Sequence, residues 1–361
     1  MSQVHSSASP ETAFRHYLLA GHGRCFAMLR EDPEQYREQI LQACTHDFSF
    51  DLQCEGSRAL FVYNLVMQYE DCRPFLRAAI RQFLSQETDE DWHEISHLAD
   101  LLCLFAEDAE PEAQAALEQK YHDLYLSLMA GRFSARAARL IDSLEYLAIL
   151  LIGQKDWVRS EQILSDIGAW YLKRRRADPQ ELKWRFRWLF DVVKQEYGES
   201  AVHERLQNTS SKELRRFYQI QMLPDEPRPR PQRKRKREAA PLSAKEMQIA
   251  RDLAVKRLRE APDSEAIEQL LQYYQSGDEA LLLPCLDALP ITQDNHTGWH
   301  DVTLAILNEE ARELLPDELF LWIYERSLCS CCRRDAVQIL LGRGRFPEAY
   351  REECRWDCNE D

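Results

Sequence analysis

A helical pattern recurs along almost the whole chain, and it constrains the fold more than any other feature. Apolar residues return every three or four positions in one segment after another, and no segment keeps the alternating period of a β-strand for more than a few residues. The 361 residues include only 11 glycines, which is few for a β-rich or loop-rich fold of this length. The sequence therefore predicts an all-α fold.

Capping residues mark where the helices begin. Three starts pair a capping side chain with proline, at Ser9–Pro10, Asp32–Pro33 and Asp178–Pro179. Ser243 is followed three residues later by Glu246, which is the spacing of a capping box. We expect helices near residues 10–29, 33–45, 56–70, 73–85, 89–107, 110–130, 134–152, 156–174, 178–197, 200–220, 243–261, 263–276, 278–288, 299–314, 316–328, 330–342 and 346–355.

A Pro- and Arg-rich segment separates two helical regions. Residues 224–241 read PDEPRPRPQRKRKREAAP, a composition typical of a solvated linker. We therefore expect an N-terminal helical repeat domain at 1–223, a disordered basic linker at 224–241 and a C-terminal helical repeat domain at 242–361. Helices with a single apolar face alternate with helices that are apolar on nearly all sides. This alternation is typical of a HEAT-like α-solenoid of stacked helix pairs. A compact irregular helical bundle is the alternative.

Three segments carry a family resemblance. They are WIYERSLCSCCRRDAVQILLGRGRFPEAYREECRWDCNED at 322–361, CEGSRALFVYNL at 54–65 and FAEDAEPEAQAAL at 105–117. These segments resemble units of bacterial HEAT-like repeat proteins, and the resemblance covers most of the chain in a diffuse way. It implies a helical solenoid in an intracellular setting and carries no catalytic residue.

Charge and cysteine usage restrict the partners and the compartment. The net charge of −15 argues against general attraction to nucleic acid or anionic lipid and favours a basic protein partner. The 11 cysteines are scattered singly along a long chain, so we expect reduced core thiols and a cytoplasmic location. The most apolar stretch, Leu144–Ile152, is about half the length needed to cross a bilayer.

The sharpest catalytic motif is His93-Glu94-Ile95-Ser96-His97. It matches H-E-x-x-H, in which two histidines one helical turn apart bind zinc and the glutamate activates a water. Glu118 lies where a third zinc ligand could follow. The competing interpretation is that His97 is a half-buried histidine on an ordinary core helix, because Leu98, Leu101 and Leu102 form an apolar stripe beside it.

Cysteines near the C-terminus have metal-ligand spacing. Cys329 and Cys332 are spaced C-x2-C, and Cys354 and Cys358 are spaced C-x3-C. Four thiolates in two such pairs can hold a structural zinc ion. The alternative, which leaves the protein without a cofactor, is that Cys329 and Cys332 pack between helices. His300 is interpreted as part of a capping loop.

Two basic clusters suggest a further class of partner. The linker cluster consists of Arg228, Arg230, Arg233, Lys234, Arg235, Lys236 and Arg237. The second cluster consists of Arg174, Arg175 and Arg176, which lie near the start of a basic and aromatic patch at 173–188. Such clusters can bind phosphates or an acidic protein surface, or act only as solvated spacers. On a helix, Trp184 and Trp188 share one face, and we expect them in the core.

The sequence as a whole predicts a non-catalytic interaction scaffold that binds a protein partner. The first alternative is a HEAT-like protein that binds nucleic acid through the linker and the patch at 173–188. The second is a zinc metallopeptidase centred on residues 93–97.

Overall fold

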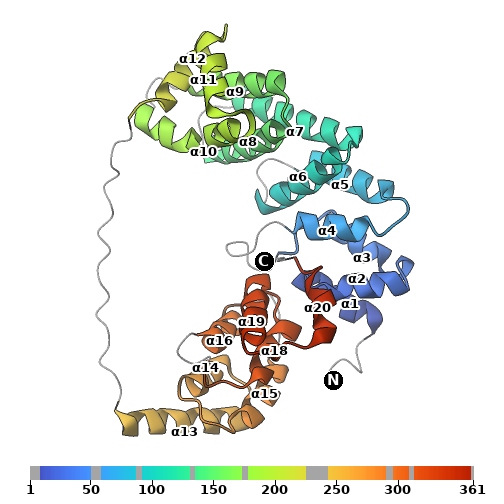
Figure 1. Ribbon diagram of the computed structural model, residues 1–361, viewed down its shortest axis with the longest axis vertical. Coiled ribbons are helices and arrows are strands. Elements are labelled where there is room, and N and C mark those ends of the chain that lie inside the picture. The colour runs from blue at the N-terminus through green and yellow to red at the C-terminus, as the bar shows by residue number, and fades with distance from the viewer. Residues whose placement is uncertain are drawn as a thin grey trace. The chain divides into compact units, whose positions relative to one another are not determined.

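The structure is a computed structural model that describes residues 9–49, 58–86, 92–130, 135–172, 178–224, 243–289, 296–308 and 313–358 (Figure 1). Throughout these residues the regular structure is helical and no strand occurs, so the predicted all-α class is confirmed. The predicted linker at 224–241 lies almost entirely outside the described residues. No helix in the described part of the chain has both the length and the apolar character needed to cross a bilayer.

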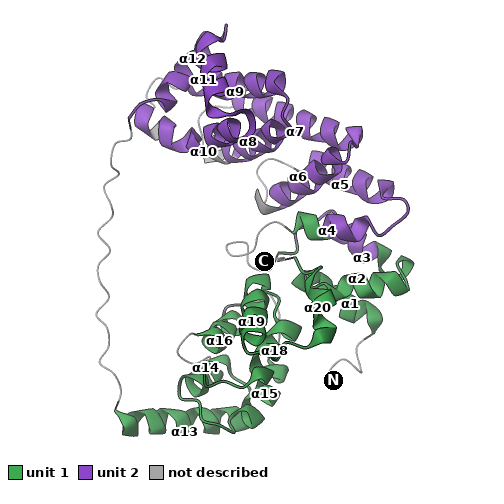
Figure 2. Cartoon of the chain, viewed as in Figure 1, with its two compact units in different colours: residues 1–37, 48–61, 234–361 green, residues 38–47, 62–233 purple. Residues whose placement is uncertain are grey.

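The chain forms two compact units, which are coloured separately in Figure 2. Unit 1 contains residues 1–37, 48–61 and 234–361, and unit 2 contains residues 38–47 and 62–233. This division differs from the one expected from composition, which separated residues 1–223 from 242–361. The difference arises because N-terminal helices pack with the C-terminal ones.

Unit 2 is built from helices that pack on their sequence neighbours. Its helices are most of α3 (Arg37–Ala43), most of α4 (Ala59–Val66), α5 (Arg73–Ser85), α6 (Trp92–Glu107), α7 (Pro111–Ala130), α8 (Ala135–Gly153), α9 (Trp157–Leu172), α10 (Pro179–Tyr197), α11 (Glu199–Asn208) and α12 (Lys212–Gln221). Helices α5, α6, α7 and α8 each contact the next one, and α5 also contacts α7 while α6 also contacts α8. Helix α8 packs against α6, α7, α9 and α10, as expected for a helix with apolar residues on several sides.

Helix α10 shows how the apolar stripe selects the buried face. Its buried residues, at spacings of three and four, are Leu182, Phe186, Leu189, Phe190 and Val193. Trp184 and Trp188 lie off this stripe, and Trp188 is 55% exposed. The prediction that both tryptophans are core residues is therefore wrong, since the phenylalanines and leucines already fill that face.

Unit 1 has a core formed mainly by its C-terminal helices. These are α13 (Ala244–Glu260), α14 (Ser264–Gln272), α15 (Glu279–Ala288), α16 (His296–Leu307), α18 (Asp317–Arg326), α19 (Ser330–Gly342) and α20 (Glu348–Cys354). Their buried side chains form one cluster that includes Trp299, Leu319, Phe320 and Ile323. Helix α13 begins with the predicted capping box, in which Ser243 and Glu246 exchange hydrogen bonds.

The N-terminal helices complete unit 1. They are α1 (Pro10–Ala20), α2 (Arg24–Glu31) and the 3₁₀-helix η2 (Glu34–Tyr36), and α2 packs against α20. Phe26 stacks on Trp356 with ring centroids 4.8 Å apart, and the backbone N–H of Cys358 donates to the carbonyl of Gly21 at 2.9 Å. An ion pair of 2.9 Å joins Arg24 to Glu353. Sequence segments more than 300 residues apart therefore pack on one another in unit 1.

Two expected helices are each divided in the structure. The one expected at 10–29 breaks into α1 and α2, because Gly21 adopts a left-handed φ of 64° that ends α1. The one expected at 200–220 breaks into α11 and α12, because the Ser211 side chain accepts the backbone N–H of Leu214 and begins a new helix. The predicted caps at Ser9 and Asp178 are confirmed.

Candidate functional site

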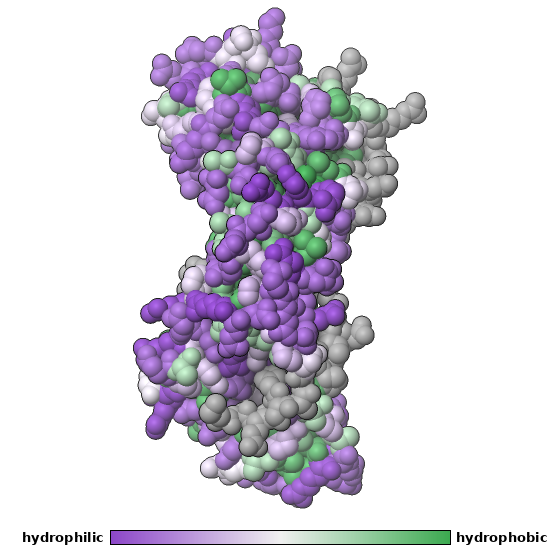
Figure 3. Space-filling view, turned by 90° about the vertical axis from the view of Figure 1, so that its right-hand side faces the viewer, coloured by the Kyte–Doolittle hydropathy of each residue, from purple (hydrophilic) through white to green (hydrophobic). Residues whose placement is uncertain are grey.

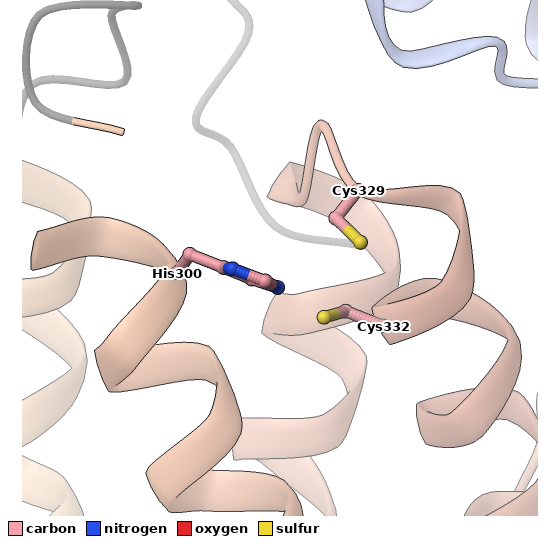
Figure 4. Close-up of side chains that lie close together, drawn as sticks. All are labelled: His300, Cys329 and Cys332. Carbon is pink, nitrogen blue, oxygen red and sulfur yellow. The ribbon is translucent and has the colours of Figure 1, made fainter. Parts of the chain in front are cut away.

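Three potential metal ligands meet in unit 1 (Figure 4). His300 comes from α16, Cys329 lies in the turn that ends where α19 begins, and Cys332 lies in the first turn of α19. One ligand atom from each residue lies within 4.8 Å of the other two, and the side chains point toward one another. Cys329 and Cys332 are buried, with 0% and 3% exposure, while His300 is half-buried.

Local backbone structure holds the two cysteines in place. Cys329 is the N-cap of α19, and its backbone N–H donates to the Ser327 hydroxyl at 3.1 Å. The C-x2-C spacing then brings Cys332 round to the same side of the first helical turn. A hydrogen bond with Cys329, together with burial, raises the pKa of the Cys332 thiol, so this thiol is protonated at neutral pH when no ion is bound.

The structure does not bring the four predicted cysteines together as one set. Within the described residues the group with metal-ligand distances contains Cys329 and Cys332 but neither Cys354 nor Cys358. Cys354 hydrogen bonds with Tyr324, and the Cys358 sulfur lies 3.9 Å from the Arg333 guanidinium. The third member of the group is His300, which lies within α16 and not in the capping loop that the sequence predicts.

The turn that carries Cys329 also contacts the N-terminal residues of unit 1. The buried guanidinium of Arg333 donates to the Ser327 carbonyl at 2.8 Å and to Asp357 at 2.7 Å. It also donates to the Gly21 carbonyl at 3.4 Å, and Arg58 donates to the Leu328 carbonyl at 3.3 Å. The two guanidinium groups therefore supply hydrogen-bond donors to carbonyls of the 327–328 turn and of Gly21.

The H-E-x-x-H segment has the predicted helical conformation in α6, but the described residues do not assemble a zinc site there. Nε2 of His97 lies 3.0 Å from the Ala43 carbonyl and donates to it, which leaves only Nδ1 of this histidine able to coordinate a metal. Glu94 accepts from the Gln86 amide at 2.6 Å, and Glu118 pairs with Arg159 at 2.7 Å. The side chain of His93 lies outside the described part.

Basic residues of the 173–188 patch are engaged where the structure describes them. Arg185 pairs with Asp142 and with Glu145, and Arg187 pairs with Asp191 at 3.9 Å. Arg174, Arg175 and Arg176 lie outside the described residues, as does the linker cluster of Arg228, Arg230, Arg233, Lys234, Arg235, Lys236 and Arg237. The patch therefore presents fewer unpaired charges than its sequence indicates.

An acidic groove of about 650 Å³ lies in unit 1. Glu265, Glu268, Gln269 and Gln272 of α14 line it, together with Ala305 of α16 and other residues, and none of the described lining residues is basic. Burial raises the pKa of Glu268, and the carboxylates of Asp301 and Glu265 raise it further. The described lining of the groove therefore carries negative charge and no positive charge.

Apolar side chains contribute to the rim of this acidic groove. Leu314, which is 70% exposed, lines it together with the half-buried Tyr274. On the face drawn in Figure 3, apolar side chains are scattered among hydrophilic ones and form no single large patch. The groove thus combines carboxylates with apolar contact area.

Comparisons with protein-family models, with curated proteins and with solved structures give no match. The resemblance to bacterial HEAT-like repeat proteins therefore stays a prediction.

Proposed function

We propose that this protein is a non-catalytic interaction scaffold that binds a basic segment of a partner protein in the acidic groove of unit 1. The observation that carries the proposal is the cluster of Glu265, Glu268 and Asp301 beside a groove whose described lining residues include no basic side chain. A lysine or arginine of the partner would lie between these carboxylates, and an apolar neighbour would contact Leu314. Charge complementarity of this kind provides specificity and fast association.

The proposed architecture is a HEAT-like α-solenoid. Unit 2 supports it, because α5 to α8 each pack on the next helix, and α5, α6 and α8 also pack on the next but one. Such packing lets successive helix pairs extend one core, and the surfaces that result are suited to holding extended partners.

Several features support a binding role over catalysis. Burial raises the pKa of the Cys25, Cys44 and Cys103 thiols, the last to about 12, so these cysteines are not reactive thiolates at neutral pH. The hydrogen bond of Glu94 with Gln86 and the ion pair of Glu118 with Arg159 argue against the zinc peptidase alternative. Pairing of Arg185 and Arg187 with carboxylates weakens the nucleic-acid alternative.

A binding titration tests this function. A fluorescent peptide rich in arginine, lysine and leucine would be titrated with the full-length protein and followed by anisotropy. The double variant Glu268→Gln/Asp301→Asn should weaken binding by about tenfold or more, since it removes two charges beside the groove. Binding should also weaken as salt concentration rises.

The matched control is Glu348→Gln/Glu352→Gln, which removes the same charge from α20. This variant should bind like the wild type if the groove is the site. Equal loss in both double variants would mean that only net charge matters, and the proposed site would be rejected.

A further inference from the structure

We infer that His300, Cys329 and Cys332 form a binding site for a soft divalent metal ion, and that Zn²⁺ is the ion this donor set fits best. Two sulfurs and one imidazole nitrogen are typical zinc ligands, whereas Mg²⁺ and Ca²⁺ require oxygen donors. No carboxylate belongs to the group. The chemistry of the donors therefore selects the class of ion.

The geometry fits a tetrahedral ion. Zinc lies about 2.3 Å from thiolate sulfur and about 2.0 Å from imidazole nitrogen, which places tetrahedral ligand atoms roughly 3.5 to 3.8 Å apart. The three ligand atoms here lie within 4.8 Å of one another, so small side-chain rotations close the difference. Figure 4 shows the three side chains converging from α16 and from the start of α19. Three protein ligands leave the fourth position for a water molecule or a further ligand.

The position of the site suggests a structural role. The ion would link α16 to the turn at 327–333, where Arg333 and Arg58 donate to the carbonyls of Ser327 and Leu328. A bound ion stabilises the state that contains its preformed ligands. Metal binding at His300, Cys329 and Cys332 would therefore stabilise the turn on which the N-terminal segment of unit 1 packs.

Metal analysis of the full-length protein tests the inference. The protein would be purified with reductant, freed of metal and divided into two samples. One sample would be given Zn²⁺ and measured by mass spectrometry for bound ion, and the other would be given Co²⁺ and measured by absorption spectroscopy. We expect one ion per chain, and a thiolate-to-cobalt charge-transfer band that requires bound sulfur. Cys332→Ser and His300→Asn should each lower the affinity for the ion by about tenfold or more, because each removes one of the three ligands.

Cys331→Ser is the matched control, because Cys331 lies between the two cysteine ligands but outside the group. It should keep both the ion and the cobalt band, and thermal unfolding should shift upward with Zn²⁺ in this variant as in the wild type. Circular dichroism would verify that each variant is folded. If Cys332→Ser did not fold, His300→Asn would carry the test, since His300 is only half-buried.

Three results would overturn the inference. One is the absence of bound ion in the wild type. Another is a cobalt spectrum that is the same in Cys332→Ser and in Cys331→Ser. The third is a Cys329–Cys332 disulfide that forms in protein purified without reductant and whose reduction does not restore metal binding, which would show that the thiols form a redox pair.

Discussion

Replacing Gly23 by alanine tests the packing of α2 against α20. A Cβ added at Gly23 would lie 1.8 Å from the carbonyl oxygen of Glu353, whereas real Cβ atoms essentially never come closer than 3.0 Å. The backbone of α20 would therefore have to move by more than about 1 Å, away from the Arg24 ion pair and the ring of Phe26. Overpacking of this kind costs about 1 to 3 kcal/mol. We expect the upper end, because a backbone carbonyl cannot rotate away as a side chain can.

Gly342 provides the matched control in the same unit. It is the last residue of α19, and a Cβ there meets no atom within 4 Å. Gly342→Ala should be neutral or stabilise the protein by up to about 1 kcal/mol. Urea unfolding would give the free energies, and hydrogen exchange should show lost protection at 21–31 and 348–358 in Gly23→Ala alone. Equal stability and equal protection in the two variants would refute the packing of α2 on α20.

Two further perturbations address the same part of unit 1. Arg333→Ala should lower the free energy of unfolding by about 3 to 5 kcal/mol, since it leaves Asp357 buried without a counter-ion. The double variant Arg333→Ala/Asp357→Asn should recover part of this loss. A double variant no more stable than Arg333→Ala would contradict the pairing of Arg333 with Asp357. Burial lowers the pKa of His22 well below 6.5, and the positive charges of Arg333 and Arg24 lower it further. Below pH 6.5 the unfolded chain therefore binds a proton that the folded chain does not, and stability should fall by about 1.4 kcal/mol per pH unit. The free energy of unfolding, measured from pH 7.5 to 5, should show this slope in the wild type but not in His22→Asn. Parallel pH dependences in the two proteins would disprove that His22 causes the loss of stability.

Local features of the fold could be predicted from sequence because they depend on neighbouring residues. The bounds of α5 follow from its apolar period and its flanking residues, and the caps at Ser9, Asp178 and Ser243 form as expected. The predicted helix bounds are wrong where a backbone conformation ends a helix although the apolar period continues. The αL conformation of Gly21 divides one expected helix although the apolar period continues across it.

The division into units could not be predicted, because it depends on contacts between distant segments. Nothing in the sequence near Gly21 indicates that its carbonyl accepts from Cys358 and Arg333. The candidate metal site illustrates the same limit. The C-x2-C spacing identified Cys329 and Cys332, but His300 comes from α16 and no local motif connects it to them.

The proposed binding role is tested most directly by locating the bound peptide. A basic peptide that carries a photoreactive group would be crosslinked to the full-length protein, and the attachment points would be mapped by mass spectrometry. We expect crosslinks within α14 and α16, and their loss in Glu268→Gln/Asp301→Asn but not in Glu348→Gln/Glu352→Gln. Crosslinks that lie elsewhere, or that persist unchanged in the groove variant, would contradict the proposal that this protein binds basic partners in the α14–α16 groove.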